Sequence, residues 1–174
     1  ILLIHSIILS IGGIPLIYLG DEVGTLNDYS YRRDPGRAGD TRWVHRPVVD
    51  WKKMARRSDE GTIEGRIYSQ LRHLIELRKD HPVLAGGEAE IVDTGNPHVF
   101  GYVRQHEGRR LLVLASFSER EQAVAGNELR LCGLSHRFTN LVTGERIETA
   151  GPLVLPPYSF VWLRPDDPQI SQYR

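Results

Sequence analysis

One short strand-like run near the start of the chain constrains the fold more than any other feature of the sequence. Residues 14–19 read Ile-Pro-Leu-Ile-Tyr-Leu, an almost continuous apolar run that is typical of a strand buried on both faces of a parallel sheet. Residues 1–11 before it suit a helix that is apolar almost all round, and residues 63–80 after it show helical periodicity. A single strand with two helices lacks the neighbouring strands that a parallel sheet needs. This part is therefore predicted to belong to a larger α/β sheet or barrel.

A long polar loop, residues 20–61, separates the predicted strand from the second helix. Loops of this length are usually functional or disordered. The loop contains Tyr29, Tyr31, Trp43 and Trp51, and aromatic side chains favour a packed, functional loop. We expect these four side chains chiefly to anchor the loop, because burial of aromatic area is their commoner use.

The hydrophobic period changes to two after Pro82, which ends the last helix. Short runs then alternate between apolar and polar residues, with glycine-containing turns between several of them. Short strands at this spacing predict an antiparallel β-sandwich domain over residues 83–164. The predicted strands are residues 88–93, 98–105, 110–117, 121–125, 128–132, 137–142, 145–149 and 158–164. Residues 165–174 are predicted to be a flexible tail.

Composition excludes several classes of function. The chain has 22 basic and 22 acidic residues and no formal net charge, so it lacks the basic excess of a typical nucleic-acid-binding protein. The lone cysteine, Cys132, permits no internal disulfide and no cysteine-based zinc site, and we expect it to be a small core residue. The seven histidines show no paired metal-binding spacing. The sequence therefore predicts no metal site.

The apolar residues 1–19 approach the length of a membrane span, but polar residues, glycines and a proline interrupt them. No basic region precedes them, so neither a membrane span nor a signal peptide is expected. The sequence opens inside an apolar helical run, which favours the C-terminal piece of a longer protein. The compartment and the oligomeric state stay open.

Several runs resemble a known enzyme family. Residues 13–22, Gly-Ile-Pro-Leu-Ile-Tyr-Leu-Gly-Asp-Glu, resemble the eighth-strand signature of the α-amylase superfamily of glycoside hydrolases and transglycosidases. Residues 40–47, Asp-Thr-Arg-Trp-Val-His-Arg-Pro, together with residues 19–28, are more particular and resemble the amylosucrase family. Residues 71–78, 140–145 and 157–163 are also similar to that family, so the resemblance covers residues 1–164.

The resemblance implies a (β/α)8 barrel enzyme. Residues 1–82 would be the end of the barrel, with the rest of the barrel packed on them. They would form a helix, then strand 8 (about 14–19), the long loop (20–61) and helix 8 (about 63–80). Residues 83–164 would be the C-terminal β-sandwich domain. The implied enzyme transfers glucose from sucrose to α-1,4-glucan, releases fructose, works by a retaining double displacement and needs no organic cofactor. Its catalytic carboxylates lie on earlier barrel strands, so this chain is expected to contain no catalytic residue.

Two alternatives stay open. One is another enzyme of the superfamily, a sucrose hydrolase or an α-glucosidase. The other is a non-catalytic carbohydrate-binding β-module, for which Tyr158, Phe160 and Trp162 alternate on one face of the last predicted strand. A terminal strand of a packed structural domain would show the same pattern. The four aromatic residues of the long loop could likewise stack on sugar rings instead of anchoring it.

The resemblance also proposes substrate-binding residues in the long loop. Arg42 matches an arginine that pairs with an acidic residue of an early barrel loop and closes the glucosyl pocket, a role that suits a planar guanidinium. Asp28 and His45 are further candidates. Asp21 and Glu22 are adjacent, and neighbours on an extended chain point to opposite sides, so they are not expected to flank one bond as a catalytic pair. We expect instead that such a carboxylate bonds to loop N–H groups.

Overall fold

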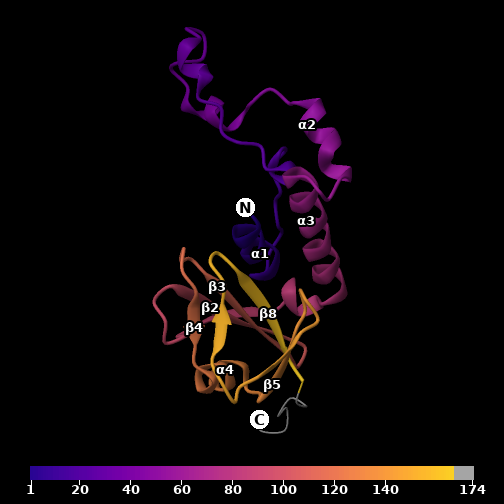
Figure 1. The fold of residues 1–174 in the computed structure, drawn as a ribbon, viewed down its shortest axis with the longest axis vertical. Helices are drawn as coiled ribbons and strands as arrows, with labels where there is room; N and C mark the ends of the chain where they lie inside the picture. The colour runs from indigo at the N-terminus through magenta and orange to yellow at the C-terminus, as the bar shows by residue number, and fades with distance from the viewer. Residues whose placement is uncertain (167–174) are drawn as a thin grey trace. The chain divides into compact units, whose positions relative to one another are not determined.

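The computed structural model of the protein describes residues 1–166 (Figure 1). The chain divides into two compact units. The first contains residue 1 and residues 17–72, and the second contains residues 2–16 and the chain from residue 73 onward. Helix α3 (Ile63–Asp80), which the periodicity predicted, begins in the first unit and ends in the second. The boundary expected after residue 82, between barrel residues and the β domain, stays a prediction.

The long loop of the first unit is organised into short helical turns. These are η1 (Asp21–Val23), η2 (Ser30–Arg33), η3 (Thr41–His45), α2 (Trp51–Ala55) and η4 (Arg56–Ser58). Asp40 and Asp50 cap η3 and α2, and five aspartates of the loop each accept a hydrogen bond from the backbone N–H two residues further along. Such Asx turns and caps give backbone N–H groups a nearby hydrogen-bond acceptor, which a sheet or a long helix would otherwise provide. The aspartates are Asp28, Asp34, Asp40, Asp50 and Asp59.

The predicted strand at residues 14–19 is not a strand in this structure. No strand lies between α1 (Leu2–Ser10) and η1 among the described residues, and Ile14 and Leu16 are 98% and 77% exposed. The reason is physical, since a strand needs a ladder partner for its backbone groups and this segment has none in the described chain. The adjoining helix is predicted correctly. It ends at Ser10, shortly before Gly12 and Gly13, whose φ angles of 107° and 68° suit glycine.

The second unit contains a six-stranded antiparallel sheet with the order β1-β2-β3-β8-β5-β6 and a two-stranded sheet, β4-β7. It also contains the helices α1 and α4 (Gly126–Gly133) and the 3₁₀ turn η5 (Pro82–Leu84). The strands are β1 (Glu88–Val92), β2 (Val99–His106), β3 (Arg109–Ser116), β4 (Gln122–Val124), β5 (Arg137–Asn140), β6 (Arg146–Glu148), β7 (Leu153–Leu155) and β8 (Phe160–Pro165).

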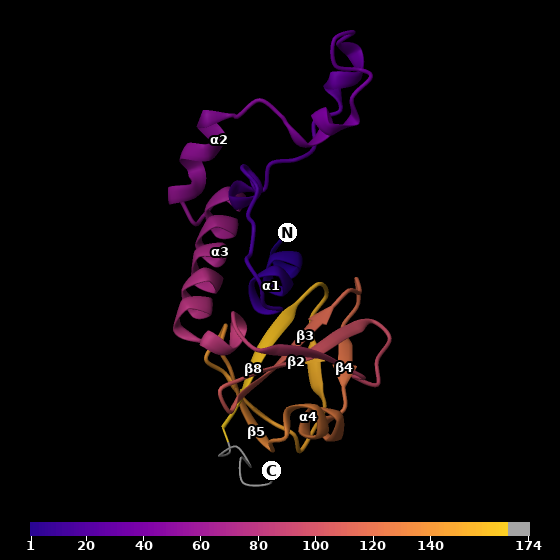
Figure 2. The same cartoon turned by 180° about the vertical axis from the view of Figure 1, so that it is seen from behind.

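Both faces of the larger sheet are covered, which gives the unit two apolar cores. On one face, Tyr102 and Trp162 pack with Leu9 of α1 and Leu74 of α3. On the other face, the sheet packs against α4 and the β4-β7 pair through Leu129 and other apolar side chains. Figures 1 and 2 show α1 and α4 at different sides of this sheet. The central strands β2, β3 and β8 are therefore buried on both sides, and the expected mostly antiparallel β domain is present.

Within residues 83–164 the sequence mispredicted one element and missed another. Residues 128–132 alternate like a strand but lie in helix α4, where Leu129 is buried and Leu131 is 49% exposed. A run of this length fits either period, and the packing of Leu129 decides in favour of the helix. Strand β7 was missed; its three residues stand between Pro152 and Pro156, and prolines argue against a strand. Of the predicted tail, Pro165 lies in β8 and Asp166 donates its N–H to the Arg137 carbonyl, whereas the rest lies outside the described residues.

The aromatic residues of β8 do not form an exposed sugar-binding face. Trp162 is fully buried and Phe160 is only partly exposed, because their shared face packs toward the core that contains Leu9 and Leu74. Tyr158, just before the strand, is 60% exposed. Cys132 is partly buried against the other core, close to expectation. Within residues 1–166, no helix has the length and apolar character needed to cross a bilayer.

Candidate functional site

Arg42 lies on η3 and is held by the residue that starts this turn. The Asp40 carboxylate accepts the backbone N–H of Arg42 at 3.0 Å, and it also accepts Nε and Nη2 of the Arg42 guanidinium at 2.8 Å each. These hydrogen bonds lower the pKa of Asp40 to about 2, because they stabilise its charged form. The Arg42 side chain is 74% exposed. The turn therefore presents a preoriented guanidinium at the surface of the first unit.

Asp28 and His45 belong to the same folded part of the loop. The backbone N–H of Asp28 donates to the Val44 carbonyl at 2.9 Å, and Nδ1 of His45 lies 3.1 Å from Oδ1 of Asn27. The Asp28 carboxylate accepts the N–H of Ser30, and hydrogen bonds to Ser30 lower its pKa. Residues 27–30 are thus fastened to the end of η3. Arg42 and His45 both lie on η3, and the joint role predicted for the three residues stays a prediction.

Two adjoining hollows of about 270 and 320 Å³ lie beside His45 in the first unit. His45 lines both, whereas Arg42 and Asp28 line neither of them. The residues common to the two hollows are Tyr18, Leu19, Gly20, Thr25, His45 and Pro47. The sequence did not single out Thr25 and Pro47, although their places in the resembling runs 19–28 and 40–47 were a signal.

The carboxylates at the end of the predicted strand act on the loop backbone. Oε2 of Glu22 accepts the N–H of Gly20 at 2.6 Å, which confirms that a carboxylate here bonds to a loop N–H. Asp21 and Glu22 lie in the short turn η1. Glu22 thus acts on the backbone of the turn that it helps to form. Residues 1–166 hold no group of three or more metal-ligating side chains.

The aromatic side chains of the loop divide into two kinds. Tyr31 is buried, and the guanidinium of Arg37 lies 4.5 Å from the ring centroid of Trp43, so these two rings anchor the loop as expected. Tyr29 and Trp51 are 54% and 75% exposed. For them the anchoring prediction is wrong within the described chain, because no apolar neighbour covers most of their surface.

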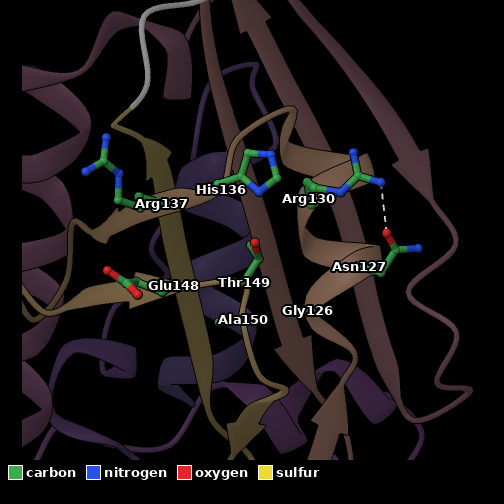
Figure 3. A pocket seen from close by; sticks show the side chains of 8 residues that line it. All are labelled: Gly126, Asn127, Arg130, His136, Arg137, Glu148, Thr149 and Ala150. Atoms are coloured by element: carbon green, nitrogen blue, oxygen red, sulfur yellow. Dashed lines mark hydrogen bonds between the residues drawn. The ribbon is translucent and has the colours of Figure 1, made fainter.

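A further hollow, of about 460 Å³, lies in the second unit beside α4, β5 and β6 (Figure 3). Nη2 of Arg130 donates to Oδ1 of Asn127 at 2.8 Å on its rim. His136 and Glu148 also line it. None of the predicted site residues lies here, and no sequence pattern pointed to this hollow, because it depends on a helix that was predicted as a strand.

Comparisons with known proteins relate the chain to enzymes that act on glucosides. Residues 89–162 match the family model described as the maltogenic amylase C-terminal domain. The chain is 31% identical to glucosylglycerate phosphorylase of Escherichia coli over 125 residues, which is 71% of this chain and 22% of that protein. It is 27% identical to trehalose synthase of Thermus thermophilus over 142 residues, 70% of this chain and 15% of that protein. The chain thus spans less than a quarter of these relatives.

Solved structures show the same fold. The structure of AmyP in complex with maltose matches with a TM-score of 0.76 and 18% identity, over 98% of this chain and 35% of that one. A mutant of MutB in complex with its substrate sucrose matches with a TM-score of 0.64 and 18% identity, over 94% and 37%. At these identities the likeness concerns the fold alone. The family match over residues 89–162 agrees with this likeness, so the β part of this chain has the fold of a maltogenic amylase C-terminal domain.

Proposed function

We propose that this chain is the C-terminal part of a glucosyltransferase that takes glucose from sucrose, transfers it to an α-1,4-glucan and releases fructose. The observation that carries the proposal is the run 40–47, whose sequence resembles amylosucrases and whose Asp40 holds the Arg42 guanidinium in a two-pronged pair. A guanidinium oriented in this way suits sugar hydroxyls or a carboxylate. In the proposed enzyme Arg42, Asp28 and His45 bind the glucosyl unit.

The proposal includes a barrel that packs on residues 1–82. Exposed apolar side chains support this part of it, since Ile14, Leu16 and Leu19 are 98%, 77% and 66% exposed. Large apolar side chains left exposed so close together in the sequence favour an interface with another part of a protein. In the proposed enzyme the missing strands give residues 14–19 their ladder partners, and loops at this end of the barrel form the substrate pocket.

The reaction proposed is a retaining double displacement, in which a carboxylate attacks the glucosyl carbon while a carboxylic acid protonates the leaving fructose. Both groups belong to the barrel outside this chain. The residues of this chain bind and orient the glucosyl unit, and they restrict the access of water to the covalent intermediate. Sucrose is the named substrate of the MutB mutant, and maltose is bound to AmyP, so the fold serves both kinds of sugar in those proteins.

Product analysis tests the proposal. The full-length protein is incubated with sucrose labelled with carbon-13 in its glucosyl unit and with an α-1,4-glucan, with and without phosphate, and the products are identified by NMR. We expect the label in new α-1,4 linkages, with one fructose released for each. Label found mainly in free glucose would indicate a hydrolase. Glucose 1-phosphate formed only with phosphate would indicate a phosphorylase, and hydrolysis of α-glucosides without sucrose consumption would indicate an α-glucosidase. Each of these three results would overturn the proposal.

A further inference from the structure

Arg104 of β2 is a fully buried charged residue whose environment contains no opposite charge. It is 1% exposed. Among residues 1–166 it forms no ion pair, and its partners are backbone carbonyls. Nη1 donates to Ile11 at 2.8 Å, Nε donates to Val83 at 3.2 Å, and Nη2 donates to Gly86. Burial lowers the pKa of Arg104, because the lost hydration of the charge is only partly replaced.

Arg78 of α3 binds the same end of α1. Its Nη1 donates to the carbonyls of Leu9 and Leu84 at 2.7 Å each, and its Nη2 donates to the carbonyl of Gly13 at 2.6 Å. The last carbonyls of a helix have no partner within the helix and carry its partial negative charge. Two guanidinium groups therefore satisfy the carbonyl end of α1 in place of a carboxylate.

The turn after α1 is shaped to admit this contact. The Gly12 backbone has a φ of 107°, and a Cβ built there would lie 3.0 to 3.2 Å from three atoms of the Arg104 guanidinium. Ser10, two residues before, places its Oγ 2.6 Å from the hydroxyl of Tyr102 on β2. The chain from residue 9 to residue 13 is thus bonded at successive points to α3 and β2, immediately before the segment that continues into the candidate site.

We propose that Arg104 and Arg78 are positioning residues: they clamp the carbonyl end of α1 and thereby fix the Gly12–Gly13 turn, from which the chain runs to the loop carrying Arg42 and His45. Strand β2 and helix α3 would then together set the start of the substrate-binding segment. The effect on catalysis rests on the proposed function, whereas the clamping of the turn does not.

Arg110 provides a matched control within the same sheet. It lies on β3, where Gln105 is its partner on β2, and its Nε and Nη2 donate to the carbonyl of Cys132 at 3.2 and 2.7 Å. Cys132 lies in the last turn of α4, so Arg110 is also a partly buried arginine bonded to the end of a helix. It serves a helix on the other face of the sheet, away from α1.

Amide hydrogen exchange on the 174-residue chain tests the clamp without any assay of activity. In Arg78→Met, we expect the α1 amides to exchange about tenfold faster or more, as the loss of charge-assisted hydrogen bonds predicts. The exchange of α4 should stay unchanged. Arg110→Met should show the reverse pattern. Arg104→Met is expected to act like Arg78→Met, and if it fails to fold, Arg78→Met alone decides. Equal acceleration everywhere, or no acceleration in α1, would overturn the clamp.

Kinetics of the full-length protein test the effect on the site. With sucrose, Arg78→Met should lower kcat about tenfold or more, as misplacement of a binding segment predicts, whereas Arg110→Met should stay within about twofold of wild type. Arg78→Lys should restore only part of the loss, because one ammonium cannot span three carbonyls in the guanidinium geometry. Wild-type turnover in Arg78→Met would overturn the positioning role. If the unmodified protein does not consume sucrose, the proposed function fails instead, and the exchange experiment still decides the clamp.

Discussion

Replacement of Arg42 by alanine is expected to abolish most sucrose turnover in the full-length protein while leaving its thermal stability nearly unchanged. The side chain is 74% exposed in the described chain, so its removal takes away little packing. In the proposed enzyme, however, its guanidinium orients the glucosyl unit. Loss of such orientation lowers turnover by on the order of a hundredfold.

Two related variants separate the role of the guanidinium from that of its charge. Arg42→Lys keeps the charge but loses the two-pronged geometry, so turnover should recover poorly. In the 174-residue chain, Arg42→Gln should raise the pKa of Asp40 from about 2 toward its ordinary value of 3.8, because the guanidinium hydrogen bonds are lost while the one from the backbone N–H remains. Carboxyl titration by NMR measures this shift. Sucrose turnover of Arg42→Ala within about threefold of wild type, which corresponds to about 0.6 kcal/mol of activation free energy, would remove Arg42 from the site.

Replacement of Trp162 by alanine is expected to be the most destabilising single change in the β domain. Trp162 is fully buried and packs with Leu9, Leu74 and Tyr102. Loss of so large a side chain from a core lowers the free energy of unfolding by about 3–5 kcal/mol. Urea unfolding of the 174-residue chain, followed by circular dichroism, measures the change.

Trp162→Phe distinguishes packing from hydrogen bonding at this position. The indole N–H of Trp162 has no hydrogen-bond partner among the described residues, so its loss removes no bond. We expect a cost of about 1–2 kcal/mol from the lost apolar area alone. Tyr158→Ala, at a site that is 60% exposed, serves as control and should stay within about 0.5 kcal/mol of wild type. Equal effects of Trp162→Ala and Tyr158→Ala would contradict the burial of Trp162.

The long periodic elements were predictable because local and tertiary preferences agree in them. Helix α3 and the strands β2, β3 and β8 follow the apolar pattern. Residues 128–132 failed because five residues fit either period, and tertiary contacts of Leu129 decided the outcome. Residues 14–19 failed for a different reason: their pattern describes a strand among neighbours that the described chain does not contain. The apolar pattern predicts neighbouring strands on both sides, and the described chain provides none for residues 14–19.

The candidate site was predictable only where side chains act on nearby backbone. The bond from Gly20 to Glu22 follows from local chemistry. The pairing of Arg42 with Asp40 was not predicted, although Asp at this spacing is a common turn-former; the resemblance directed attention to a partner elsewhere. The clamp made by Arg78 and Arg104 joins positions far apart in the sequence. Contacts at such separations cannot be predicted from the periodicity of apolar residues.

The most direct test of the account is the fructose released from sucrose by the purified full-length protein and by the 174-residue chain at equal molar concentrations. The account predicts steady release by the full-length protein, because the barrel supplies the nucleophile and the acid that a retaining mechanism needs. It predicts no release above a protein-free blank by the chain alone, which carries the binding segment without those groups. Fructose release by the chain alone, or none by the full-length protein, would contradict it.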